Sequence, residues 1–137
     1  MEFTARIIKE GKFWLGEIKE LELITQGRSR KEAVFMVKDL LNEMLFDQFG
    51  KKIIFEVLKE EKEALVISIK DLYAIPFVLK RLRTIKGRTI KEISKQCGFK
   101  SLNAYAQYEQ GKRIPGLLQF EKLLEIMGVH LKIAVSL

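Results

Sequence analysis

Residues 89–115 read TIKEISKQCGFKSLNAYAQYEQGKRIP, and this stretch decides the fold of the C-terminal half of the chain. Thr89 and Glu92 stand at the spacing of a capping box, so a helix is expected over residues 90–97. A second short helix is expected over residues 102–110, since a serine precedes it and a glycine follows it. Two short helices joined by a tight glycine turn are typical of the helix-turn-helix arrangement, whose second helix enters the DNA major groove.

Two further helices are expected, one on either side of this motif. Pro76 is expected in the first turn of a helix that Gly87 ends, because the missing amide of proline costs nothing there. Another helix is expected from Leu117 to Gly128, where apolar residues recur every three or four positions. Alternation over residues 131–137 predicts a final strand, which pairs either with the N-terminal sheet or with a second copy of the chain.

The net charge of +7 is confined to the C-terminal half. Residues 1–70 contain 13 basic and 13 acidic side chains, whereas residues 71–137 contain 12 basic and 5 acidic ones. This asymmetry indicates that the second half meets a polyanion, most simply nucleic acid, although solubility alone also explains an excess of charge. We therefore predict two domains, residues 1–70 and residues 71–137.

The basic half is similar to a known family of DNA-binding domains. Residues 77–131 resemble an Xre-family, phage-repressor-type helix-turn-helix domain through the pattern Thr89-x-x-Glu92-Ile93-x-x-x-Cys97-Gly98 and then Tyr105-x-x-Tyr108-Glu109-x-Gly111-Lys112-x-x-Pro115. The resemblance implies an all-α domain in which three polar residues face the DNA bases, namely Ser101, Asn103 and Gln107. It also implies a buried motif core that contains Ile93, Cys97, Tyr105 and Tyr108.

The spacing of the expected base contacts agrees with this assignment. Asn103 and Gln107 are four residues apart and share one helix face, and their amides suit bidentate contact with adenine. The alternative is that both are ordinary exposed polar residues. Four cations near helix starts and in the loop after the second helix are expected to contact phosphates: Lys91, Lys100, Lys112 and Arg113.

The N-terminal half predicts a small antiparallel sheet with one helix on one face, so the chain is expected in the α+β class. Ser29 and Glu32 form a second capping-box pair and Gly50 is a stop signal, which together predict the helix. A two-residue turn is expected at Glu10-Gly11. Apolar runs predict strands over residues 3–8, 13–18, 21–26, 53–58 and 64–69.

The order of these elements resembles the N-terminal domain of HicB-type antitoxins. The resemblance rests on the strand pair, then Leu23-Ile24-Thr25-Gln26-Gly27, and then Ser29-x-x-Glu32-Ala33. It implies a partial ribonuclease-H-like fold that neutralises a small basic HicA-type messenger-RNA endonuclease, and a C-terminal domain that represses the shared operon. A homodimer or larger homo-oligomer is expected, since a palindromic operator requires two-fold symmetry. The alternative is a stand-alone Xre-family transcription regulator whose N-terminal domain binds a ligand or another protein.

Phe13 and Trp14 are the expected partner-binding residues of the N-terminal domain. Neighbouring residues of a strand point to opposite faces, so one is expected to pack under the helix and the other to remain exposed. A large exposed aromatic side chain is a good anchor for a protein partner.

Enzymatic activity is not expected. The acidic residues of the N-terminal half fall at strand ends and turns, so an active nuclease, which would gather them around two metals, is the less favoured interpretation. Cys97 is the only cysteine and His130 the only histidine, so no disulfide, metal site, catalytic triad or cofactor is expected. The start of the chain lacks a signal-peptide pattern and no uncharged run exceeds eight residues, which predicts a cytoplasmic protein without a membrane span.

Overall fold

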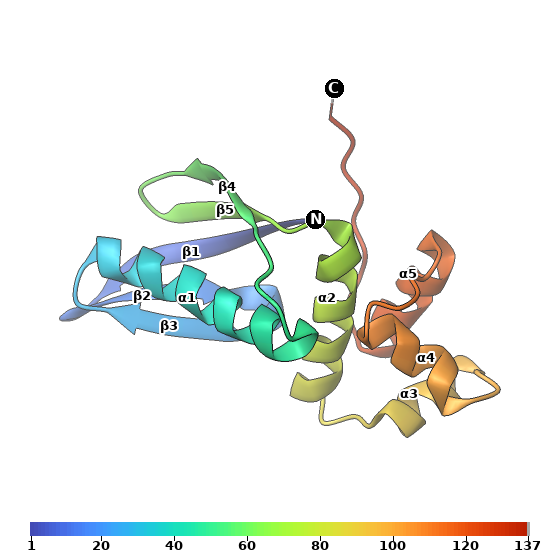
Figure 1. Cartoon of the computed structure of the whole chain (residues 1–137). Helices are drawn as coiled ribbons and strands as arrows, with labels where there is room; N and C mark the ends of the chain where they lie inside the picture. The colour runs from blue at the N-terminus through green and yellow to red at the C-terminus, as the bar shows by residue number, and fades with distance from the viewer. Residues whose placement is uncertain (137) are drawn as a thin grey trace. The chain divides into compact units, whose positions relative to one another are not determined.

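The chain folds into two compact units, Met1–Ala74 and a second that begins at Ile75. The computed structural model describes residues 1–136 (Figure 1). The division falls inside one continuous helix, α2 (Asp71–Ile85), rather than in a linker. The change in charge balance at residue 70 therefore lies close to the division but does not reveal the helix that runs through it.

The N-terminal unit contains a five-stranded sheet and one long helix. Its elements are β1 (Glu2–Glu10), β2 (Phe13–Ile18), a 3₁₀ turn (Lys19–Leu21), β3 (Leu23–Gly27), α1 (Arg30–Phe49), β4 (Glu56–Glu60) and β5 (Ala64–Ser68). The strand order is β3-β2-β1-β5-β4, and every neighbouring pair is antiparallel. α1 lies across one face of β1, β2 and β3 (Figure 1). The expected antiparallel sheet with one helix is therefore confirmed.

The core of this unit lies between α1 and the sheet. Apolar side chains on the inward side of α1 and on the facing side of the strands fill it, among them Ala5, Ile7, Ile18, Leu23, Val37, Leu41, Leu45, Leu65 and Ile67. Because side chains alternate along a strand, the residues between these point to the opposite side of the sheet. We call that side the outer sheet face.

Two boundaries near the start of the unit differ from the predicted ones. Glu10 pairs with Phe13, so the two-residue turn consists of residues 11–12, one position later than expected. β3 begins two residues later than expected, because Leu21 closes the 3₁₀ turn and Glu22 has a left-handed backbone with a φ of 48°.

The strand predicted over residues 53–58 is displaced toward the C-terminus. β4 begins at Glu56, opposite Ser68 of β5, and continues to Glu60, inside the stretch expected to be only a link. Ile53 is buried although it precedes the strand, so its apolar character reflects packing rather than strand pairing. β4 and β5 nevertheless form the expected hairpin.

Close packing and capping fix the start of α1. The hydroxyl of Ser29 accepts a hydrogen bond from the backbone N–H of Glu32 at 3.1 Å, as a capping box requires. A Cβ atom at Gly27 would lie 2.5 Å from the backbone nitrogen of Ala33, so only glycine lets β3 end this close to the helix. Arg30, the first residue of α1, donates to two backbone carbonyls of the turn between β4 and β5, which ties that hairpin to the helix start.

Helices form the regular structure of the C-terminal unit within the described residues. α2 is followed by α3 (Ile90–Cys97), α4 (Leu102–Glu109) and α5 (Leu117–Ile126), and the last three match the expected helices to within two residues. The expectation for Pro76 was wrong, because α2 begins at Asp71 and places this residue inside the helix. An interior proline removes one helical hydrogen bond, and the burial of Pro76 indicates that side-chain packing offsets the loss.

Residues 129–136 contain no helix or strand. The strand expected over residues 131–137 is therefore absent from the described part of a single chain, and residue 137 lies outside the described residues. A strand needs a hydrogen-bonded neighbour, and here none is supplied within the described chain. Pairing with a second copy stays a prediction.

We expect Gly27→Ala to destabilise the N-terminal unit by about 1 to 3 kcal/mol, because the added Cβ would overlap the backbone of α1. Trp14 is the only tryptophan, so its fluorescence during urea unfolding follows this unit. Gly116→Ala is the clash-free control in the C-terminal unit, since a Cβ at that position meets no atom within 4 Å, and circular dichroism follows its unfolding. An unchanged Trp14 midpoint in Gly27→Ala would contradict the packing argument.

Candidate nucleic-acid interface

The turn between α3 and α4 is fixed by its backbone. Gly98 ends α3 in a left-handed conformation with a φ of 80°, which residues with a side chain rarely adopt. The N–H of Phe99 then donates to the carbonyl of Ser94 at 2.9 Å, which is the long hydrogen bond of a Schellman motif. The direction in which the chain enters α4 is therefore set by local hydrogen bonds.

The ring of Phe99 holds this turn against α4. Its centroid lies 6.3 Å from that of Tyr105 and 5.9 Å from that of Tyr108. Phe99 is missing from the core residues expected from the sequence. Its position directly after the helix-ending glycine is a usable signal, because a hydrophobic contact at that position often accompanies the Schellman motif.

The four residues expected in the motif core are all buried: Ile93, Cys97, Tyr105 and Tyr108. The sulfur of Cys97 accepts a hydrogen bond from the side-chain amide of Gln119 at 3.3 Å. The backbone carbonyl of Cys97 accepts a hydrogen bond from the side-chain ammonium of Lys122, also at 3.3 Å. Both donors lie on α5. Cys97 therefore joins α3 to α5, as a packing residue does.

A buried ion pair joins α4 to α2. Arg83 donates two hydrogen bonds to the carboxylate of Glu109, at 2.7 and 2.9 Å, and only 6% of the Glu109 side chain is exposed. A third N–H of Arg83 donates to the backbone carbonyl of Arg88 at 2.9 Å, just before α3. One side chain thus links α2, α4 and the segment that leads into α3. Sequence reasoning missed the pair, because its members are 26 residues apart and no local pattern connects them.

Charge and burial set the ionisation of this cluster. The hydrogen bonds to Glu109 raise the pKa of Arg83. Burial raises the pKa of the Tyr105 phenol, and the negative charge of Glu109 raises it further. At neutral pH the cluster therefore contains a cationic Arg83 and a neutral Tyr105.

The outward side of α4 presents polar side chains. Tyr105 faces the core, so Asn103 and Gln107 lie on the opposite side, the first exposed and the second half-buried. Ser101 is the N-cap residue, and its hydroxyl makes no capping hydrogen bond to α4. Gln110 is exposed on the same outward side and was not among the residues expected there.

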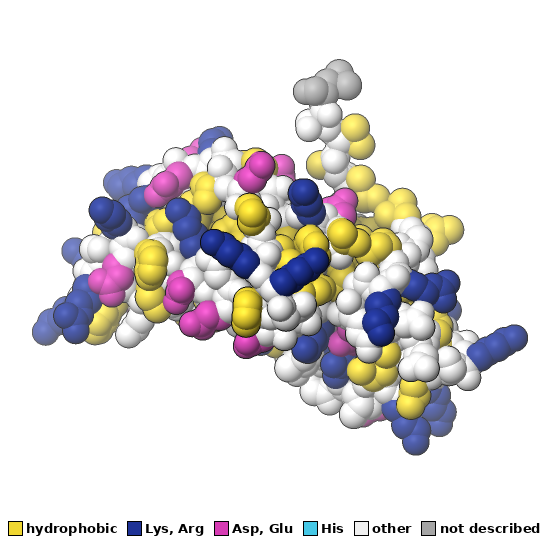
Figure 2. All heavy atoms as spheres, in the orientation of Figure 1, with side chains coloured by type: hydrophobic (Ala, Val, Ile, Leu, Met, Phe, Trp, Pro, Cys, Tyr) yellow, Lys and Arg dark blue, Asp and Glu magenta, His cyan; other side chains and the backbone are white. Residues whose placement is uncertain are grey.

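The four cations expected at phosphates are all exposed: Lys91, Lys100, Lys112 and Arg113. Lys91 lies in the first turn of α3, and Lys100 lies in the turn before α4. The carbonyl of Gln107 accepts hydrogen bonds from the backbone N–H groups of Lys112 and Arg113 at 3.0 and 3.3 Å, which holds this basic pair beside the end of α4. Figure 2 shows Lys and Arg side chains projecting from the α3–α4 part of the unit. The expected cations therefore lie in the first turn of α3 and in the turns before and after α4.

A known family has the same motif. Residues 79–133 match the family model described as Helix-turn-helix. The match confirms the helix-turn-helix expected in the C-terminal half and indicates a DNA-binding, Xre-like regulator. We found no curated protein that matches the chain.

Phe13 and Trp14 lie on opposite faces of β2. Trp14 shares the α1 side of the sheet with Gly16, where an added Cβ would meet Val37 of α1, and Trp14 is half-buried. Phe13 lies on the outer sheet face and is 44% exposed. The outer face also has a shallow hollow, which is lined by Thr4, Arg6, Glu17, Lys19 and Glu20.

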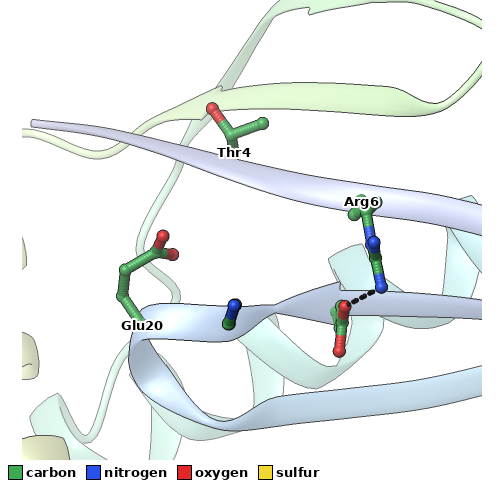
Figure 3. Close-up of a pocket in the computed structure, with 5 residues that line it drawn as sticks. Thr4, Arg6 and Glu20 are labelled. Carbon is green, nitrogen blue, oxygen red and sulfur yellow. Dashed lines mark ion pairs between the residues drawn. The ribbon is translucent and has the colours of Figure 1, made fainter.

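The charges of this hollow balance one another. Arg6 and Glu17 form an ion pair at 2.7 Å between β1 and β2, and Figure 3 shows this pair together with Thr4 and Glu20, which also line the hollow. Within residues 1–136, no group of three His, Cys, Asp or Glu side chains could hold a metal ion, and His130 is exposed after α5. Among the same residues, no helix is both long and apolar enough to cross a membrane.

We expect Arg83→Met to destabilise the C-terminal unit by about 3 kcal/mol, because it removes the guanidinium that neutralises a buried carboxylate. The double variant Arg83→Met, Glu109→Leu should recover most of that loss, since neither charge is then buried. Circular dichroism follows the unfolding of the helices and measures both changes. The unfolding midpoint of the N-terminal unit, followed by Trp14 fluorescence, should not change and serves as an internal control. A double variant no more stable than the single one would show that the charge itself is unimportant.

We expect Gln107→Ala to weaken binding to a selected high-affinity duplex by about 1 to 3 kcal/mol and to relax the choice at one base pair, as loss of a bidentate base contact does. Binding titrations on that duplex and on its single-base variants measure the effect. An equal loss on random DNA would contradict a role in base recognition.

Lys112→Ala should weaken binding to all duplexes alike. A lost phosphate contact also reduces the slope of log K against log salt concentration by about one unit, because one fewer counterion is released. Titrations at several salt concentrations give this slope. If the variant and the unaltered chain give the same slope, Lys112 does not contact a phosphate.

Proposed function

We propose that the chain is a HicB-type antitoxin of a type II toxin-antitoxin system. The N-terminal unit binds and inhibits a small basic HicA-type messenger-RNA endonuclease, and the C-terminal unit represses the operon that encodes both proteins. The observation that carries the proposal is the presence, in one chain, of a helix-turn-helix unit and a separately packed sheet-and-helix unit. The latter has no excess of positive charge, so it needs a function other than DNA contact.

The junction between β3 and α1 supports the HicB assignment. The residues that carry the resemblance, 23–33, include β3, the capping residue Ser29 and the close packing of Gly27 on α1. The order of three antiparallel strands followed by a helix also supports the partial ribonuclease-H-like fold that the proposal includes.

The C-terminal unit acts as a homodimer in this proposal. Ile133 and Val135 are exposed, at 62% and 90%, and they alternate with less apolar residues. Pairing of this segment between two copies would bury them and would supply the two-fold symmetry that a palindromic operator requires.

The chain has no catalytic activity of its own in this proposal. Carboxylates of the N-terminal unit serve as ion-pair partners: Glu17 pairs with Arg6, and Glu60 pairs with Arg30 at 3.0 Å. A stand-alone Xre-family regulator is the second candidate, and the hollow on the outer sheet face is the feature that favours it. Such a regulator would need no neighbouring toxin.

We expect the double variant Asn103→Ala, Gln107→Ala to protect bacteria from the toxin encoded by the neighbouring reading frame. The same variant should fail to repress the operon. The two substitutions remove base contacts from α4 and leave the N-terminal unit unchanged. Growth with the toxin induced, measured beside a reporter for the operon promoter, separates the two activities. Cell death at normal levels of the variant would show that neutralisation needs the DNA-binding half.

A further inference from the structure

The helix α1 has large apolar residues on the side that faces away from the sheet. Phe35 is 61% exposed and Phe46 is 54% exposed, whereas Val37, Leu41 and Leu45 on the inward side are buried. A surface helix that packs on one sheet normally has a polar outward side. α1 is therefore apolar on two sides, and its packing on the sheet explains only one of them.

The two exposed rings lie in line along the helix. They are separated by 11 residues, which at about 100° per residue places them within roughly 20° of each other around the axis. At about 1.5 Å per residue they are roughly 16 Å apart. Asp39 and Asn42 lie between them on the same side. This spacing suits two separate apolar pockets on a partner surface.

Charge is divided between the two flanks of this line. The helical positions place Glu32, Asp39, Glu43 and Asp47 on one flank and Lys31 and Lys38 on the other. Over α1, Figure 2 shows isolated hydrophobic side chains with acidic side chains on one side of them and basic ones on the other. The acidic flank is the longer one, so it favours a partner whose matching surface is basic.

A second copy of this chain fits the face less well. In a two-fold antiparallel pair each flank meets its own copy, so the acidic flanks would repel each other. In a parallel pair the two lysines could meet Glu32 and Asp39, but Glu43 and Asp47 would face no cation. The charge pattern therefore argues against self-association through α1.

We infer that the outward side of α1 is the docking surface for a basic partner protein, with Phe35 and Phe46 as its apolar anchors. Two aromatic rings that enter pockets supply the buried area, and the acidic flank sets the orientation. Identifying the partner as the basic toxin rests on the proposed function. The location of the surface departs from the expectation that Phe13, on the outer sheet face, is the exposed anchor.

The double variant Phe35→Ala, Phe46→Ala tests the inference in the full-length chain. The probe is a catalytically inactive form of the basic protein encoded by the neighbouring reading frame, and calorimetry measures its binding. We expect binding at least tenfold weaker, because truncation of central aromatic anchors has effects of this size. Both rings are exposed, so the unfolding midpoint by Trp14 fluorescence and the affinity for DNA should not change.

The matched control is Phe13→Ala, Ile24→Ala, which removes two side chains of similar exposure, 44% and 63%, from the outer sheet face. We expect the control to bind the probe like the unaltered chain. Loss of binding in the control but not in the α1 variant would overturn the inference and leave the antitoxin function standing. If the unaltered chain binds no such protein, or no such reading frame exists, both the antitoxin function and the inference fail.

Charge reversal gives a second, independent readout. Glu43→Lys, Asp47→Lys should weaken binding, and the affinity of this variant should depend less on salt concentration than that of the unaltered chain. If this variant and the unaltered chain bind the probe with equal affinity at low salt, the inference that the partner surface is basic is wrong. The inference is also wrong if the double variant Phe35→Ala, Phe46→Ala converts dimers of the chain to monomers. In that case a second copy of the chain, and not a basic partner, covers the outward side of α1.

Discussion

The ion pair between Arg83 and Glu109 is the constraint on which the DNA-binding unit depends. A carboxylate that is almost fully buried must be neutralised, and the fork of one guanidinium does this with two parallel hydrogen bonds. The same guanidinium also binds the carbonyl that precedes α3. These hydrogen bonds therefore link α2, the approach to α3, and α4 through a single side chain.

The direction of α4 has a second, local determinant. Gly98 and the Phe99 N–H set the chain direction at the end of α3, and the Phe99 ring then packs on both tyrosines of α4. The ion pair acts at the far end of α4, where Glu109 is the last helical residue. A helix fixed at both ends holds Asn103 and Gln107 in defined positions. Recognition of base edges needs such positions, because hydrogen bonds to bases tolerate little displacement.

Local chemistry could be predicted from the sequence, whereas contacts between distant residues could not. The caps Ser29 and Thr89 and the glycine after α3 follow rules that act within four residues, and the helices they delimit lie where expected. β4 was misplaced because the limits of a strand depend on its partner β5. Pro76 was misplaced because packing outweighs the local cost of an interior proline. The pair of Arg83 and Glu109 had no local signal at all.

The two sides of α1 illustrate a general limit of reading periodicity. A search for one apolar stripe finds Ala33, Val37 and Leu41, and it then treats Phe35 and Phe46 as interruptions of the pattern. Burial separates the two sets, because the first is enclosed by the sheet and the second is exposed to water. Phe35 and Phe46 contribute less to folding than a core residue does, since more than half of each side chain stays exposed. Their free energy of transfer from water therefore remains available for association, so the residues that break a helical pattern are the ones to examine for a partner.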